Sequence, residues 1–357
     1  MNFYLENKPD FEKCLKRIET WYHFGEIIDR PPVQFLSFYP PEDNFAKNTY
    51  QTQEEKWNDT EYIISQYLSS IKNKAFLGES FPHWFPNLGP SVYSAFFGVN
   101  LQYEEATSWA IPTINEPTDL EKLKFDGNNK YFKKIMDMTE IALEMCQDKC
   151  IVGYTDLHPG LDCVAGWRNN EDLLMDLYDE PEFVKKAVRK ATQSFPTIFN
   201  EFMKITLGKN NPSLTWFGLP FRKSVHIPCC DFAAMISSDQ FEEFQMPALL
   251  EEVNTSENNI FHIDGIGVAK HLELILSLPN MNAVQWVQGD GETKPIMQWI
   301  PLLKRIREAN KSIMVYLDPG EVDSFIQAMP PQGILMSIVT NDDDLKKTII
   351  KKLEKWH

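Results

Sequence analysis

A histidine and an aspartate stand two residues apart at His262 and Asp264, at the end of a short apolar run. Residues i and i+2 of a strand project from the same side, so a strand here would turn both side chains into one space. An imidazole and a carboxylate placed in this way can bind zinc, or the acid can orient the imidazole as a general base. The alternative is a packed histidine followed by a helix cap, because aspartate is a common N-cap residue.

Other apolar runs also end in polar residues. Asp156 and His158 follow one run, Asp231 closes a second, and Asp318 follows a third. In a barrel enzyme the catalytic side chains come from the C-terminal ends of the strands. We therefore expect these acids to converge with Asp264 on one face, where their mutual repulsion requires a cation or a raised pKa.

The elements that must position these residues follow a regular order. Apolar runs alternate with helical patterns from residue 151 onward, and an earlier run between proline pairs lies at 33–39. Continuous apolar runs are typical of parallel strands covered on both faces. The later runs are 151–155, 213–219, 224–231, 260–263, 283–287, 312–317 and 334–339. This pattern predicts an α/β fold, a (β/α)8 TIM barrel over residues 31–357, with a helical N-terminal extension over 1–30.

Composition excludes several classes of protein. The chain has 35 Lys and Arg against 51 Asp and Glu, a net charge of −16, which argues against nucleic acid and anionic membranes as partners. It contains no G-x-G-x-x-G, no P-loop and no G-x-S-x-G motif. The 6 cysteines form no dense framework. Adjacent strand residues point to opposite faces, so of Cys229 and Cys230 we expect one core thiol and one that is partly exposed, rather than a metal ligand. Without an apolar signal core or an 18-residue apolar run, a cytoplasmic protein is expected.

Several segments resemble the uroporphyrinogen decarboxylase superfamily, which also contains corrinoid-dependent methyltransferases. The segments are 82–98, 156–181, 231–247, 261–265 and 316–322. The resemblance covers most of residues 30–345 and implies a (β/α)8 barrel.

Two departures make the chain more similar to the methyltransferase-like members than to true uroporphyrinogen decarboxylases. The decarboxylases grip substrate carboxylates with an arginine-rich segment, whereas the corresponding run 33–39 contains no arginine. A mouth lined with aspartates would repel that polyanionic substrate. The thiol-activating methyltransferases bind zinc through His-x-Cys and a later cysteine, but here Asp264 and Asp318 stand at those places. The resemblance thus implies a harder zinc site of His262 and Asp264, with Asp318 or His158 as a further ligand.

We therefore expect a methyltransferase that moves a methyl group between a small methylated compound and a corrinoid carried by a separate protein. No permanently bound corrinoid is expected, because the motif D-x-H-x-x-G is absent. The expected catalytic residues are His262, Asp264, Asp156 and Tyr316, and the expected pocket residues are His158, Asp231, Gln285, Trp286 and Asp318.

Two alternatives stay open. A decarboxylase acting on a uroporphyrinogen-type or another small acid would need a cation in the pocket, for which Arg168 and Arg222 are the candidates. A non-catalytic binding barrel is the other alternative, in which the absent cysteines reflect a lost metal site.

Overall fold

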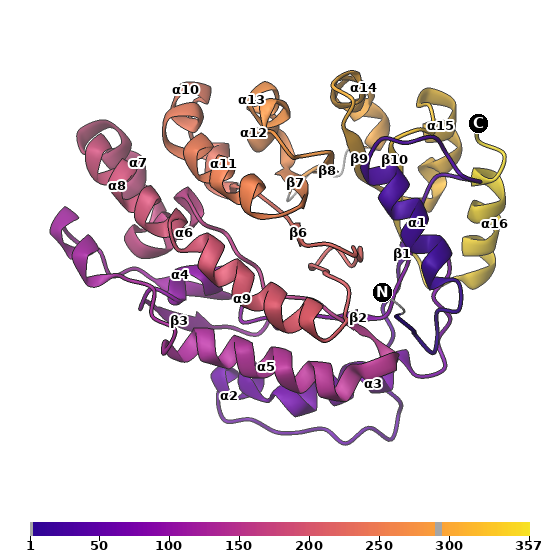
Figure 1. Ribbon diagram of the computed structural model, residues 1–357, viewed down its shortest axis with the longest axis horizontal. Coiled ribbons are helices and arrows are strands. Elements are labelled where there is room, and N and C mark those ends of the chain that lie inside the picture. The colour runs from indigo at the N-terminus through magenta and orange to yellow at the C-terminus, as the bar shows by residue number, and fades with distance from the viewer. Residues whose placement is uncertain (1–2, 290–294) are drawn as a thin grey trace.

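A curled sheet of six parallel strands forms the centre of the molecule, in the order β1-β10-β9-β8-β7-β6. The computed structural model describes residues 3–289 and 295–357 (Figure 1). β1 and β10, which come first and last in the amino-acid sequence, are hydrogen-bonded neighbours in this sheet. The six strands are β1 (Val33–Leu36), β6 (Val225–His226), β7 (Asn258–Asp264), β8 (Ala283–Val287), β9 (Ser312–Leu317) and β10 (Ile334–Val339).

Two smaller strand pairs complete the described sheet structure. β2 (His83–Trp84) and β5 (Ile151–Val152) are parallel, and β3 (Asn100–Tyr103) and β4 (Ser108–Ile111) form an antiparallel hairpin. The prediction of an α/β fold is thus confirmed, and its main sheet is parallel and curled. A closed eight-stranded ladder is not seen among the described residues.

The segment between β5 and β6 explains why the ladder stays open. The prediction of a strand over 213–219 is wrong, because this segment contains only an isolated bridge between Ser213 and Phe221. Pro212 and Pro220 flank it and cannot donate a backbone hydrogen bond, and Gly218 has a φ of +69°. The segment still contacts the sheet, since Tyr154 N donates to Leu214 O at 3.1 Å.

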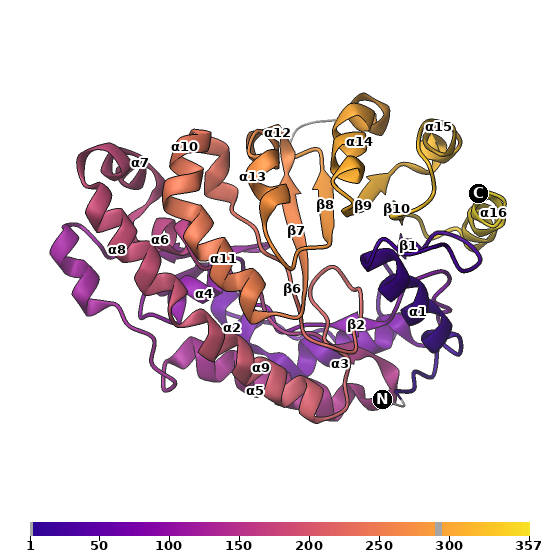
Figure 2. The ribbon, with the colours of Figure 1, turned by 45° about the horizontal axis from the view of Figure 1, so that its top comes forward.

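Helices cover the outer side of the sheet, and those between β6 and β10 each follow one strand and precede the next (Figure 2). No helix of the described residues has the length and apolarity needed to cross a membrane. The helices are α1 (Phe11–Tyr22), α2 (Gln53–Asn58), α3 (Thr60–Ile71), α4 (Val92–Ala95), α5 (Lys130–Cys146), α6 (Leu161–Arg168), α7 (Asn170–Asp179), α8 (Pro181–Thr192), α9 (Phe195–Gly208), α10 (Ser238–Gln240), α11 (Met246–Thr255), α12 (Gly265–Ala269), α13 (Leu272–Ser277), α14 (Ile300–Glu308), α15 (Val322–Ala328) and α16 (Asp343–Leu353).

Helix α1 packs against the N-terminal ends of the strands. Trp21 Nε1 donates to the carbonyls of Ile313 and Gly333 at 3.2 and 3.1 Å, and the Tyr22 hydroxyl accepts from Asn259 N at 2.6 Å. These partners begin or precede β9, β10 and β7. The opposite end of the sheet, where the strands terminate, is therefore the end available for a functional site.

A fully buried carboxylate joins α1 to the first strand. Glu79 accepts from Arg17 of α1 at 2.9 Å, from Arg30 at 2.8 and 3.0 Å, and from Val33 N at 2.7 Å. Both arginines are also buried. Burying charges is costly unless they are paired and hydrogen-bonded. Removal of any one of these side chains would therefore leave a buried charge without one of its partners.

Replacing Glu79 with alanine leaves the two buried guanidinium groups without their shared partner. We expect the free energy of unfolding to fall by about 3–5 kcal/mol, measured by urea denaturation. Glu121→Ala is the matched control, because Glu121 pairs with Lys186 on the surface and its removal should change stability little. Equal stability of the two variants would contradict the structural role of the network.

Candidate metal centre

Three potential metal ligands meet at the C-terminal end of β7. Asp231, His262 and Asp264 each offer a ligand atom, and these atoms all lie within 4.8 Å of one another. His262 and Asp264 share one side of β7 because they are two residues apart. Asp231 begins the short 3-10 helix Asp231–Met235, which follows β6, the neighbouring strand. One imidazole and two carboxylates form a nitrogen and oxygen donor set that suits zinc or a harder divalent metal.

A glutamine on the next strand orients the imidazole. His262 and Gln285 are paired in register on β7 and β8, and His262 Nδ1 contacts Gln285 Oε1. An amide oxygen only accepts, so Nδ1 carries the proton and Nε2 is the ring nitrogen left to bind a metal. The Trp216 ring stands nearly perpendicular to the imidazole, with the ring centroids 5.3 Å apart. These two neighbours fix both the tautomer and the ring plane.

An aromatic cavity of about 430 Å³ lies beside this centre. Trp216 and Tyr316 line it, and they also contact His262 and Gln285 respectively. Burial raises the pKa of the Tyr316 phenol, so this hydroxyl keeps its proton near neutral pH. The remaining lining is mostly apolar and aromatic, which suits a small organic ligand. It includes Phe35, Tyr39, Tyr67, His83 and Phe217.

One lysine also borders this cavity. The side chain of Lys346 on α16 is only 2% exposed, and its Nζ lies 2.8 Å from Asp343 Oδ1. A second contact joins it to the Tyr39 hydroxyl at 3.3 Å. A buried ammonium at the wall of an apolar cavity can recognise an anionic group on a ligand.

A second cluster lies around His158. His158, Asp162 and Cys229 offer ligand atoms that also lie within 4.8 Å of one another. The Nε2 atom of His158 is 3.2 Å from Asp156 Oδ1, and its Nδ1 atom faces the Cys229 sulfur. A separate cavity of about 560 Å³ is lined in part by His158, Asp162 and Asp231.

The charges of this second cluster are strongly interdependent. Burial alone lowers the pKa of His158, but Asp156, Asp162 and Asp231 outweigh it and raise the value to about 9. Burial, with repulsion from Asp231, raises the pKa of Asp162 to about 6. Burial and the neighbouring carboxylates raise the pKa of Cys229 well above its usual range. The protein alone therefore holds a charged imidazole and a protonated thiol, and a protonated thiol is a poor nucleophile.

A buried acid lies behind these clusters, on α11. Glu252 is fully buried, and its Oε2 is 2.9 Å from His226 Nε2. Burial raises the pKa of Glu252 and lowers that of His226, so both are neutral. The acid then donates to Nε2, while Nδ1 donates to the Tyr154 hydroxyl at 3.1 Å, which in turn donates to Val225 O at 2.9 Å.

Glu252→Gln tests this neutral chain, because the amide still donates to His226 but cannot ionise. The unfolded chain ionises near pH 4.5, whereas the folded acid stays protonated, so wild-type stability is lost as pH rises. We expect the stability difference between variant and wild type to grow from about pH 5 to about pH 8, by at most about 1.4 kcal/mol per pH unit. Denaturant titration at several pH values measures it, with exposed Glu251→Gln as control. A difference that shrinks with pH would indicate an ionised Glu252.

Several predicted site residues lie elsewhere. Trp286 does not share the pocket face with Gln285, contrary to the prediction: it lies on the other face of β8 and packs on Trp299, with ring centroids 4.9 Å apart. Asp318 is exposed and forms a capping box with Glu321, so it is a helix cap and not part of either cluster.

The two arginines proposed as pocket cations are also engaged elsewhere. Arg222 pairs with Glu12 and Glu19 of α1, at the end of the sheet opposite the site. Arg168 pairs with Asp176 at 2.8 Å and lines neither cavity.

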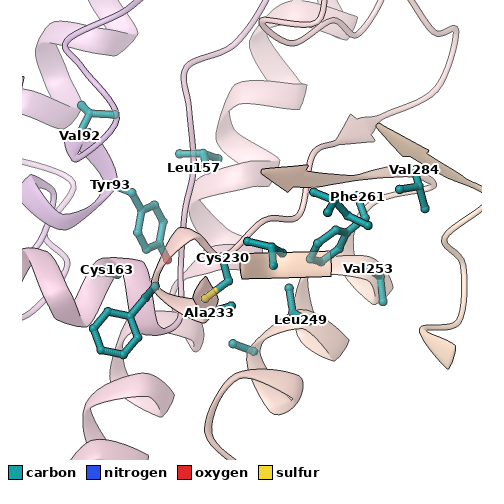
Figure 3. Close-up of a cluster of buried hydrophobic side chains, with 14 of the residues drawn as sticks. Val92, Tyr93, Leu157, Cys163, Cys230, Ala233, Leu249, Val253, Phe261 and Val284 are labelled. Atoms are coloured by element: carbon teal, nitrogen blue, oxygen red, sulfur yellow. The ribbon is translucent and has the colours of Figure 1, made fainter. Parts of the chain in front are cut away.

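Sequence reasoning missed Asp162, Lys346 and the role of Cys229. Figure 3 shows Cys230 among buried apolar side chains that include Ala233 and Leu249, as expected of a core thiol. Cys229, on the other side of the chain, faces His158. The signal was present, because adjacent extended residues point to opposite sides and only one thiol could reach the core.

Comparison with known proteins supports the fold. No protein-family model and no curated protein matches the sequence. Among solved structures, the fold is similar to that of a methyltransferase from Methanosarcina mazei, with a TM-score of 0.61. The match covers 96% of this chain and 98% of that chain, at 10% sequence identity. At this identity the similarity establishes a shared architecture over nearly the whole length.

Proposed function

We propose that the protein is a methyltransferase that moves a methyl group between a small methylated compound and a corrinoid carried by a separate protein. The observation that carries this proposal is the convergence of Asp231, His262 and Asp264 beside an aromatic cavity. The similarity in fold to a methyltransferase supports it. We further propose that the chain is a member of the uroporphyrinogen decarboxylase-like superfamily.

The donor atoms at this centre fit zinc. His262 would bind through Nε2, since Nδ1 faces Gln285, and the carboxylates of Asp231 and Asp264 would complete a three-residue set. Three protein ligands leave a position for substrate, as in catalytic zinc sites. When bound, the metal supplies a Lewis acid that polarises the oxygen or nitrogen carrying the methyl group.

The protein's own residues then position the substrate and supply a proton. The aromatic cavity would hold the body of the methylated compound against its apolar lining. As the bond between the methyl carbon and its heteroatom breaks, the bonding electrons stay on the heteroatom and the methyl group passes to the external acceptor. Tyr316, which lines the cavity and whose phenol keeps its proton, would donate that proton to the heteroatom.

Removal of one ligand tests this assignment. We expect His262→Ala to bind about one zinc ion fewer per chain by elemental analysis, because an imidazole ligand is lost. With a panel of methylated amines and methyl ethers and free cob(I)alamin, methylcobalamin formation should fall about 100-fold or more. Asp318→Asn should keep both zinc and activity, since asparagine also caps helices. Unchanged zinc content in His262→Ala, or no reaction with any methylated compound, would contradict the proposal.

A decarboxylase acting on a small acid is the second candidate, and Lys346 favours it. This buried ammonium borders the aromatic cavity and could hold a substrate carboxylate. Neither Arg168 nor Arg222 is placed to do so.

Lys346→Met separates the two candidates. If a carboxylate substrate binds there, losing a charge-assisted hydrogen bond should weaken binding of small aromatic or aliphatic acids about 10-fold or more, measured by calorimetry. Lys347→Met is the matched control, because Lys347 is exposed and pairs with Asp344 on the surface. Release of carbon dioxide from a bound acid, abolished by Lys346→Met, would establish decarboxylation. Methyl transfer that is unaffected by Lys346→Met would exclude a role for this lysine in methyl transfer.

A further inference from the structure

We propose that His158, Asp162 and Cys229 bind a divalent transition metal of the zinc class at a second site, distinct from the centre at His262. Their ligand atoms lie within 4.8 Å of one another. Two segments of the fold supply them: His158 and Asp162 lie between β5 and the first turn of α6, and Cys229 follows β6. The proposal does not depend on the methyltransferase activity.

The donor set differs in kind from the first centre. An imidazole, a carboxylate and a thiolate are the mixture of nitrogen, oxygen and sulfur ligands that zinc accepts in proteins. Softer thiolate ligands favour zinc over magnesium or calcium. Binding through the Cys229 sulfur would require the thiolate, so uptake of the metal would release the thiol proton.

The residues around the three ligands orient them. With Nδ1 of His158 facing the Cys229 sulfur, its Nε2 can donate to Asp156, 3.2 Å away. This carboxylate–histidine pair is the usual support of a metal-bound imidazole. The Asp162 carboxylate accepts from the backbone N–H groups of Asp231 and Phe232 at 3.0 and 2.9 Å, which fixes its position. His158 and Asp162 are therefore already held in place by neighbouring groups.

The charge around the cluster also calls for a cation. Asp156, Asp162 and Asp231 all act on His158. Among the described residues, no lysine or arginine forms an ion pair with these three carboxylates. A divalent ion would offset this local excess of negative charge better than a single imidazolium.

The site has room for a ligand of its own. His158, Asp162 and Asp231 line the cavity of about 560 Å³, which extends to Ser94 and Trp109. Three protein ligands leave an open position, as in zinc sites that activate water or substrate. We infer an open site facing this second cavity rather than a closed structural one.

Cobalt titration of the metal-free full-length protein tests the proposal. Co²⁺ bound to a thiolate gives a charge-transfer band in the near ultraviolet, which nitrogen and oxygen ligands alone do not give. We expect this band in the wild type and in His262→Ala, and its loss in Cys229→Ser. Cys230→Ala is the matched control and should keep the band, because Cys230 is not one of the three clustered ligands although its sulfur lies 3.7 Å from Asp162 Oδ1.

A milder substitution tests the supporting carboxylate. Asp156→Asn keeps all three ligands, so the band should remain while the affinity for Co²⁺ falls about 10- to 100-fold. This variant and the wild type keep the test valid if Cys229→Ser fails to fold.

The outcomes separate this site from the first centre. Absence of the band in the wild type, or its persistence in folded Cys229→Ser, would overturn the proposal. If the band is lost in Cys230→Ala but not in Cys229→Ser, the thiolate ligand is Cys230 and not Cys229, and the proposal is overturned as well. If His262→Ala keeps all its zinc while Cys229→Ser loses about one ion per chain, the second site stands and the metal centre of the proposed function fails.

Discussion

The parallel direction of the strands brings carboxylates together at one edge of the sheet. Asp231 and Asp264 follow or end neighbouring strands, so the sheet itself places their negative charges near one another. Ions of like charge at this distance are stable only with a cation, a captured proton or strong hydrogen bonds. The structure supplies part of this through His158 and through backbone N–H groups directed at Asp162. The chemistry available to both clusters depends on how the remaining negative charge is balanced.

At the other end of the sheet, the buried charges are paired. There α1 covers the strand ends, and the buried carboxylate of Glu79 is fully paired by Arg17 and Arg30. One end of the molecule is thus closed by a satisfied ion network, and the other is left with carboxylates and cavities. This asymmetry is the arrangement expected when stability is assigned to one face of a barrel-like fold and chemistry to the other.

The sequence predicted those features that depend on local periodicity. Continuous apolar runs indicated parallel strands, and the two-residue spacing placed His262 and Asp264 on one side of β7. The same rule excludes Trp286 from the face that carries Gln285, and the Asp-x-x-Glu pattern at Asp318 was a readable helix cap. The pair of His158 and Cys229 could not be predicted, because 71 residues separate them and only the tertiary fold joins them.

The two clusters also suggest how metal chemistry could be divided. The His-x-Asp pattern of β7 lacks the sulfur ligand that soft zinc sites use, and Cys229 supplies a sulfur only to the neighbouring cluster. The segment that carries Cys229 and Asp231 contributes one ligand to each cluster, so a shift of this segment would alter both. A hard centre beside the aromatic cavity and a softer one beside the second cavity would differ in metal preference and in substrate. Asp231, which belongs to the first cluster and lines the second cavity, is the residue through which the two sites would influence each other.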